Sequence, residues 1–443
     1  MGNGMGRRLG GVKRGPALLA CLLATLSVVI GGELSAGAVP GRLLAAGRSK
    51  AGVVLAAATG PMSFHYGFDL SNQEPETGPG ATAAAKQVMA KFDGSYMDQS
   101  LLGFGAGTNP EPRPGHYNMT GIAQRLSLIQ AAGGIPVITL IGVPAWMRPG
   151  TTTFFDPPAP QYYQAFATLC AYVAKSFPQV KYFVVWNEMK GFLVSGNTYN
   201  YVGYTQMYND VYRAIKGVRP TAMVGGPYTS LSAWEVPHVG VVSTLHGAYG
   251  YVNQGMATAF SYWLAHKVGA DFVAVDGATE NASKGKQIAN PATASSLYAV
   301  IDSWIRSQTT LPIWWMESHI SPVGWTTAEG AAARVATVAE MASSGASVGM
   351  QWQPQDELGL TDEGLWTSTL VPSGGQGTPL GADLTAALPV LEHGPTLATG
   401  EPAGVLVVSD SAGWVAVNTN SLPSSAIVGG IDAHLSAGQV LVS

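Results

Sequence analysis

The sequence is poor in cysteine and in charge. Its 443 residues include two cysteines, and charged residues make up 11% of them, where roughly 25% is typical of globular domains. The net charge is −4 and no run of basic residues is present, which argues against a nucleic-acid partner. Cys21 lies in a segment that we expect to be removed, and Cys170 alone cannot form an internal disulfide.

Motifs of cofactor enzymes are also lacking. The sequence has no His-x-x-x-His pair, no glycine-rich phosphate loop and no cysteine pair, so we expect neither a metal nor a nucleotide cofactor. Residues 345–349 match the pattern Gly-x-Ser-x-Gly, but a helical stretch precedes Ser347 and a strand follows it. A nucleophile elbow needs the reverse order, so we interpret this segment as a turn. Nothing in the sequence implies an obligate protein partner.

The N-terminus has the pattern of an export signal. Basic residues stand at positions 7, 8, 13 and 14, residues 16–30 are almost wholly apolar, and residues 36–38 are small, as signal peptidase requires. We therefore expect residues 1–38 to be a signal peptide and the protein to be secreted. Anchoring by an uncleaved signal is the alternative, although the apolar segment is shorter than the roughly 20 residues of a membrane span.

Apolar runs of strand length alternate with helical stretches from about residue 61. They lie at 64–70, 97–104, 135–143, 182–186, 222–227, 272–275, 312–316 and 347–352. This alternation predicts an α/β fold, a (β/α)8 TIM barrel over residues 61–372. The alanine- and glycine-rich residues 39–60 would form a linker. From 373 to 443 the pattern predicts a connecting segment and a small antiparallel β-module.

Two of these runs lead directly to a glutamate. Asn187 and Glu188 follow the fourth run, and Glu317 follows the seventh. The C-terminal ends of barrel strands carry the catalytic residues of this fold, and two opposed carboxylates are what glycoside hydrolysis needs. The pair therefore predicts a sugar-cleaving site, in which the Asn187 amide binds a substrate hydroxyl.

Further candidates stand at or near other predicted strand ends. Aromatic faces there can stack on sugar rings, and polar groups can bind hydroxyls. The candidates for substrate binding are Trp146, Tyr228, Trp315, Trp352, His65 and Asp276. Asp69, in the same run as His65, is a further candidate for binding a hydroxyl. Strand alternation counted back from Glu317 predicts that Trp314 points outward against the helices.

Several segments, taken in order, resemble a clan A glycoside hydrolase, and most of all family 39, which contains β-xylosidases and α-iduronidases. They are Gly115-His116-Tyr117-Asn118, residues 132–137 and 142–147, Val185-Trp186-Asn187-Glu188, residues 208–218 and residues 224–227. The resemblance implies that Glu188 is the acid/base and Glu317 the nucleophile. The sequence departs from the family at two strand ends, because residues 97–101 lack an arginine and residues 271–276 lack a His-x-Tyr pattern.

The sequence thus predicts a secreted retaining glycoside hydrolase, β-xylosidase-like by resemblance, that cleaves a poly- or oligosaccharide with two glutamates. One alternative is an endo-acting glycanase on a bacterial or plant polysaccharide, with the same catalytic pair. The other is a carbohydrate-binding barrel without turnover. The two departures from the family leave the sugar open.

Overall fold

The computed structural model describes residues 63–70, 79–151, 153–280, 291–320, 325–356 and 364–443. The expected signal peptide (1–38) and linker (39–60) lie outside these ranges, so both stay predictions. No helix in the described ranges combines the length and the apolar character that crossing a membrane requires.

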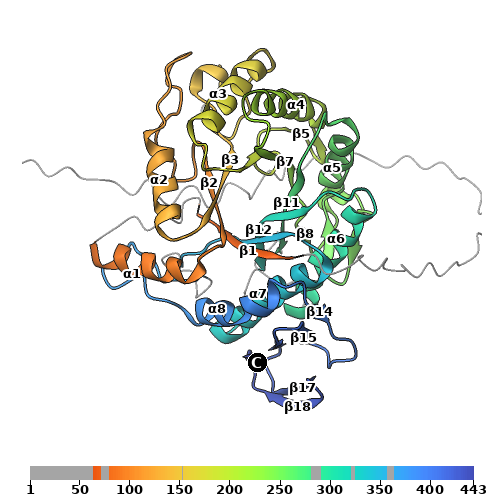
Figure 1. The fold of residues 1–443 in the computed structure, drawn as a ribbon. Coiled ribbons are helices and arrows are strands. Elements are labelled where there is room, and N and C mark those ends of the chain that lie inside the picture. The colour runs from red at the N-terminus through yellow and green to blue at the C-terminus, as the bar shows by residue number, and fades with distance from the viewer. Residues whose placement is uncertain (1–62, 71–78, 152, 281–290, 321–324, 357–363) are drawn as a thin grey trace, which may run out of the picture. The chain divides into compact units, whose positions relative to one another are not determined.

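Eight parallel strands close into a barrel, so the predicted TIM barrel is confirmed (Figure 1). They are β1 (His65–Asp69), β2 (Tyr96–Ser100), β3 (Ile135–Leu140), β4 (Tyr182–Val185), β7 (Met223–Ser230), β11 (Phe272–Glu280), β12 (Ile313–Ile320) and β13 (Val348–Gln351). Each pairs with the next along the chain, and β13 pairs with β1 to close the barrel. Each predicted run overlaps one of these strands.

Helices surround the barrel (Figure 1). They are α1 (Pro79–Met89), α2 (Thr120–Ala131), α3 (Tyr163–Ser176), α4 (Tyr201–Val218), α5 (Gln254–His266), α6 (Pro291–Arg306), α7 (Thr327–Ser344) and α8 (Pro379–Leu391). Local sequence fixes several ends. At the start of α7, Thr326 and Glu329 form a capping box, and the helix ends at Gly345 in the left-handed conformation (φ 96°), as a C-terminal glycine permits.

Short strands are added at the C-terminal side of the barrel. The hairpin β5 (Leu193–Ser195) and β6 (Thr198–Tyr199) follows β4. The long segment between β7 and β11 contributes β8 (Ala233–Trp234), β9 (His246–Gly247) and β10 (Gly250–Val252). Because β8 pairs with the last residues of β11, this insertion extends the sheet at the barrel mouth.

A small antiparallel β-module ends the chain, as predicted. Its sheet contains β14 (Thr396–Leu397), β15 (Val405–Ser409), β16 (Trp414–Asn418) and β19 (Val440–Val442), and β17 (Ser424–Val428) and β18 (Ile431–Leu435) form a hairpin. One sheet face, with Leu406, Val408, Val415 and Val417, belongs to the same buried cluster as Leu388 and Leu391 of α8. A module too small to fold comfortably alone thus shares the core of the larger unit.

Trp314 and Trp315 are adjacent on β12, and each faces the side opposite to the one predicted for it. Trp314 lies inside the barrel and stacks on Phe272, with ring centroids 4.1 Å apart. Trp315 is 0% exposed on the outer face, where its Nε1 donates to Asp302 Oδ1 at 2.9 Å. Val275 pairs with Trp315 but Asp276 pairs with Glu317. This bulge inserts one residue and breaks the alternation on which the prediction relied.

Trp315 should therefore matter for stability. Trp315→Phe removes the indole donor and leaves a buried carboxyl oxygen of Asp302 without it, which should lower the free energy of unfolding by about 1–3 kcal/mol. Urea denaturation would measure the change, with Trp352→Phe as the control at a half-buried tryptophan. A change below about 0.5 kcal/mol, the usual range for surface substitutions, would contradict the buried position of Trp315.

Candidate active site

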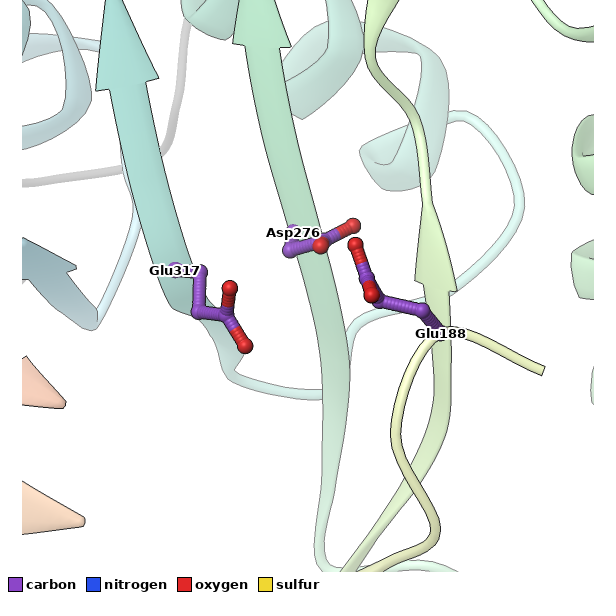
Figure 2. A group of neighbouring side chains, drawn as sticks. All are labelled: Glu188, Asp276 and Glu317. Atoms are coloured by element: carbon purple, nitrogen blue, oxygen red, sulfur yellow. The ribbon is translucent and has the colours of Figure 1, made fainter. Parts of the chain in front are cut away.

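Three carboxylates, two on strands and one on the loop after β4, meet at the C-terminal end of the barrel (Figure 2). Glu188 follows β4 after Trp186 and Asn187, while Asp276 of β11 and Glu317 of β12 are register partners. One carboxylate oxygen of each residue lies within 4.8 Å of those of the other two. Carboxylates with oxygens this close can act on the same glycosidic bond, as glycoside hydrolysis by a pair of carboxylates requires.

The backbone at this site is locally strained. Trp186, Glu188 and Met189 have φ angles of 70°, 47° and 56°, and Tyr228 has a φ of 50°. Side chains other than glycine rarely adopt this left-handed region, which costs of order 1–3 kcal/mol for each residue. Such residues tend to cluster at functional sites, and here they lie just after β4 and within β7, close to the carboxylates.

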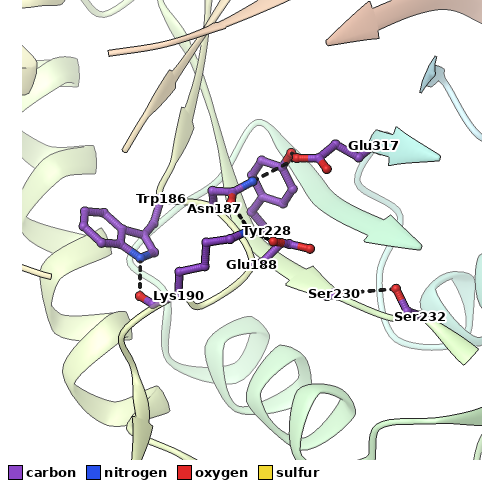
Figure 3. Close-up of polar contacts among 8 residues, drawn as sticks. All are labelled: Trp186, Asn187, Glu188, Lys190, Tyr228, Ser230, Ser232 and Glu317. Atoms are coloured by element: carbon purple, nitrogen blue, oxygen red, sulfur yellow. Dashed lines mark hydrogen bonds and ion pairs between the residues drawn. The ribbon is translucent and has the colours of Figure 1, made fainter. Parts of the chain in front are cut away.

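Glu317 is held by two hydrogen bonds to the same oxygen (Figure 3). Its Oε1 accepts from Asn187 Nδ2 at 3.0 Å and from the Tyr228 hydroxyl at 2.6 Å. Burial and the charge of Glu317 raise the pKa of Tyr228 well above its usual range, so its hydroxyl stays protonated and donates. Two donors to one oxygen fix the orientation of the Glu317 carboxylate.

Lys190 completes this group, although its place in the sequence did not suggest a role. Its Nζ donates to Asn187 Oδ1 at 2.6 Å and forms an ion pair with Glu188 Oε2 (Figure 3). Burial lowers the pKa of Lys190, against the opposing charges of Glu317, Asp276 and Asp69. The lysine thus links the two glutamates through Asn187. The position of a lysine two residues after Glu188 could have indicated its role from the sequence.

Asp98 is a second site residue that the sequence pattern did not predict. It is 2% exposed, and Tyr96, two residues earlier on β2, belongs to the interior cluster, so alternation turns Asp98 inward. Thr139 donates its hydroxyl to Asp98 Oδ2 at 2.8 Å. Burial, opposed by this hydrogen bond and reinforced by the charge of Glu317, raises the pKa of Asp98 to about 7.

The structure brings together Asn187, Glu188, Tyr228, Asp276 and Glu317 of the predicted site residues. Two predicted residues lie elsewhere. Trp315 is packed against α6, as described above. His65 is the first residue of β1, at the N-terminal end of the barrel. The centroid of its ring lies 5.7 Å from that of the Tyr96 ring. The prediction placed His65 near the wrong end of its strand.

Trp146 and Trp352 are half-buried and follow strand ends. Trp352 comes directly after β13, and its ring meets that of His319 edge-on at 5.1 Å. Trp146 lies in a short 3-10 helix after β3 and donates from Nε1 to the Glu111 carbonyl at 3.0 Å. Trp352 is therefore beside the strand that carries Glu317, whereas Trp146 is tied to the loop that contains Glu111. The substrate-binding role of both stays a prediction.

Glu188, Asp276 and Glu317 could also coordinate a cation, since three carboxylate oxygens within 4.8 Å suit a hard divalent ion. The contacts of the two glutamates favour another use. Glu188 contacts the Lys190 ammonium, and Glu317 accepts two hydrogen bonds. A metal ion would compete with the ammonium for the same carboxylate.

No protein-family model and no curated protein matches the sequence. Solved structures do match. A family 39 glycoside hydrolase from the gut symbiont Bacteroides cellulosilyticus has a TM-score of 0.59 at 16% identity, over 86% of this chain and 79% of that one. A monomeric β-xylosidase from Caulobacter crescentus has a TM-score of 0.54 at 18% identity, over 83% and 75%. A GH30 endoxylanase from Clostridium papyrosolvens has a TM-score of 0.52 at 11% identity, over 87% and 97%. At these identities the similarity establishes a shared fold.

Proposed function

We propose that this protein is a retaining clan A glycoside hydrolase, related to family 39. The observation that carries the proposal is the meeting of Glu188 and Glu317 at the barrel mouth, with carboxylate oxygens within 4.8 Å. The fold shared with enzymes described as glycoside hydrolases supports it. In this function Glu317 is the nucleophile and Glu188 the acid/base.

The contacts of Glu317 suit a nucleophile. Asn187 and Tyr228 both donate to Oε1, and these two hydrogen bonds fix the orientation of the carboxylate. One oxygen of Glu317 attacks the anomeric carbon, and the bond to the leaving oxygen breaks as Glu188 gives that oxygen its proton. Glu188, now ionised, then takes a proton from the water that releases the sugar from Glu317.

Lys190 gives Glu188 a partner for its ionised state. The ammonium contacts Glu188 Oε2, and this contact is strongest after the proton has left for the departing oxygen. When Glu188 takes the proton from the attacking water, it becomes neutral and its ion pair with Lys190 is weakened. Glu188 is then ready to donate the proton in the next cycle. The same lysine holds Asn187 by its side-chain oxygen and thereby directs the amide N–H toward Glu317.

Product stereochemistry tests the proposal. Aryl glycosides of common sugars in both anomeric forms would be screened first. The first product of any substrate that is cleaved would then be followed by NMR, and we expect retention of the anomeric configuration. Inversion would contradict double displacement, and binding of oligosaccharides without any cleavage would support the carbohydrate-binding alternative. Mass analysis of products from oligosaccharides separates end-wise release from internal, endo-type cleavage.

Tyr228→Phe should slow the reaction without unfolding the protein. The variant loses the hydroxyl that donates to Glu317 Oε1, and hydrogen bonds to charged groups are worth about 1.5–3 kcal/mol, so kcat should fall about 10- to 100-fold. Tyr204→Phe is the matched control, because that buried hydroxyl donates to the Val185 carbonyl. Equal losses of kcat in the two variants would contradict a specific role for Tyr228.

Secretion is proposed from the N-terminal pattern alone. We expect residues 1–38 to be removed on export, so that the mature protein starts at Val39. Intact-mass measurement of protein from the culture medium would show this start. Recovery of the full-length chain in the membrane fraction would replace secretion with anchoring.

A further inference from the structure

Three phenylalanines from two loops meet at the barrel mouth. Phe104 lies in the loop after β2, and Phe154 and Phe155 lie in the loop after β3. The centroid of the Phe104 ring lies 5.3 Å from that of Phe154 and 5.1 Å from that of Phe155. All three residues are half-buried, so part of each remains accessible to a ligand. We call these three residues the aromatic cluster.

Lys190 joins the aromatic cluster to the acid/base. Its Nζ lies 5.5 Å from the centroid of the Phe104 ring and forms the ion pair with Glu188. The contacts to Glu317 take a longer route, because the Asn187 side chain accepts from Lys190 and in turn donates to Glu317. Along these contacts, Lys190 alone separates the cluster from Glu188, whereas Lys190 and Asn187 both separate it from Glu317.

The loops that carry the cluster pack tightly on each other and on the loop of Glu188. A Cβ atom at Gly191 would collide with the backbone carbonyl of Phe155, so these two loops touch backbone to backbone. A Cβ atom at Gly103 would collide with the Phe154 ring, which therefore lies flat against the chain next to Phe104. The aromatic cluster is thus a preformed part of the mouth, fixed beside the acid/base.

Phe104 has a costly backbone conformation. Gly103 and Ala106 exchange backbone hydrogen bonds of 3.0 and 2.8 Å, which makes Phe104 and Gly105 the central residues of a turn. Their φ angles are 46° and 83°. Two positive φ angles are the pattern of a type I′ turn, which favours asparagine and glycine. The turn does not explain a phenylalanine at this position, and strain of this kind is typical of ligand-binding sites.

The reaction places the leaving group on the side of the acid/base. Glu317 attacks the anomeric carbon from one face of the sugar, and the oxygen that receives the proton of Glu188 leaves from the other. The aglycone, which is the group attached to that oxygen, therefore extends past Glu188. Because Lys190 and the aromatic cluster lie beside Glu188, the cluster is in position to contact the aglycone.

The chemistry of the cluster suits an aromatic aglycone better than a second sugar. Phenylalanine has no hydrogen-bonding group, and a sugar hydroxyl that loses water needs a partner. Lys190 beside the cluster already donates to Asn187 and pairs with Glu188. An aromatic ring has no such need and gains from edge-to-face contact, the geometry in which Phe104 and Phe154 already meet, at 86°.

We propose that the aromatic cluster is the aglycone subsite, and that the protein acts on glycosides of aromatic alcohols or phenols. This inference rests on the proposed glycosidase function and names the part of the substrate that leaves. The ring of the aglycone adds a fourth member to the cluster. A sugar in the same place would turn its hydroxyls toward phenylalanine.

Non-hydrolysable thioglycosides test the subsite by binding alone. Benzyl, cyclohexylmethyl and thio-linked disaccharide forms of xylose, glucose, galactose and mannose would be titrated calorimetrically into the native protein, in both anomers. Benzyl and cyclohexylmethyl groups are similar in size and differ in aromaticity. We expect a benzyl form to bind about three- to tenfold more tightly than its cyclohexylmethyl counterpart. Equal affinities, tighter binding of the disaccharide, or no binding of any benzyl form would overturn the inference.

Substitutions within the cluster locate the preference. Phe104→Leu and Phe155→Leu each remove one ring and keep an apolar side chain, and Phe155→Leu leaves the contact of Phe104 with Lys190 in place. We expect each variant at least to halve the ratio of benzyl to cyclohexylmethyl affinity. Tyr212→Leu is the matched control on α4, because Tyr212 is also half-buried with a lysine, Lys216, 5.6 Å over its ring. An unchanged ratio in both phenylalanine variants, or an equal loss in Tyr212→Leu, would overturn the inference.

Cleavage assays separate this inference from the function on which it rests. Benzyl and cyclohexylmethyl O-glycosides have leaving groups of similar basicity, so their ratio of kcat/KM reports contacts of the aglycone. Cleavage without a benzyl preference would overturn the inference and leave the glycosidase function standing. A benzyl preference in thioglycoside binding, without cleavage of any O-glycoside, would support the aromatic subsite and contradict the glycosidase function.

Discussion

Glu317→Ala will abolish cleavage of every glycoside that the native protein hydrolyses. Removal of the nucleophile leaves no group to form the glycosyl-enzyme, so kcat should fall about 10⁴-fold or more whatever the leaving group. The measurement is kcat for an activated aryl glycoside and for an oligosaccharide. Both should fall below detection while the melting temperature shows a folded protein.

A small nucleophile distinguishes this loss from misfolding. Azide can occupy the space that the Glu317 side chain leaves and attack the anomeric carbon directly. We expect a glycosyl azide of inverted configuration from an activated substrate. Substantial residual turnover with water in Glu317→Ala, at the native configuration, would contradict the assignment of Glu317 as nucleophile.

Glu188→Ala will slow the reaction in proportion to the basicity of the leaving group. A poor leaving group needs the proton of Glu188, so kcat/KM for an oligosaccharide should fall about 10²- to 10⁴-fold. An activated aryl group departs without that proton, so kcat/KM for an activated aryl glycoside should fall much less. The measurement is kcat/KM across aryl glycosides whose leaving groups differ in pKa.

Azide again separates the two roles. In Glu188→Ala the glycosyl-enzyme still forms, and azide needs no base to attack it, so the product should be a glycosyl azide of retained configuration. If Glu188→Ala gave the inverted azide and Glu317→Ala the retained one, the two roles would be reversed. Equal losses across all leaving groups would contradict proton donation by Glu188.

Much of the architecture could be predicted because it depends on local patterns. Parallel barrel strands are buried on both faces and therefore appear as short, continuous apolar runs, and each predicted run overlapped a strand. The positions of Glu188 and Glu317 followed from the same rule, since residues at C-terminal strand ends meet at one mouth. Residues far apart in the sequence could thus be paired before the structure was known.

The errors have specific physical causes. Trp315 was misplaced because a bulge near Met316 shifts the register between β11 and β12, and alternation cannot reveal an inserted residue. His65 belongs to the right strand but to its N-terminal end, which faces away from the mouth. In both cases the element was predicted correctly and the direction of the side chain was not.

The omissions have another cause. Lys190 matters through its ion pair with Glu188. Asp98 matters because it is buried in the barrel and interacts with the charge of Glu317. Their burial and their neighbours arise only when β2, β4, β11 and β12 come together. The missing arginine in residues 97–101 marked this strand as unusual but did not indicate that Asp98 turns inward.

The covalent intermediate provides the most direct measurement of the central claim. In Glu188→Ala the second step lacks its base, so the glycosyl-enzyme should accumulate when an activated aryl glycoside is added. We predict that the intact mass increases by one glycosyl residue and that digestion assigns the increase to the peptide containing Glu317. Turnover without any such adduct, or an adduct on Asp276 or another residue, would contradict double displacement through Glu317.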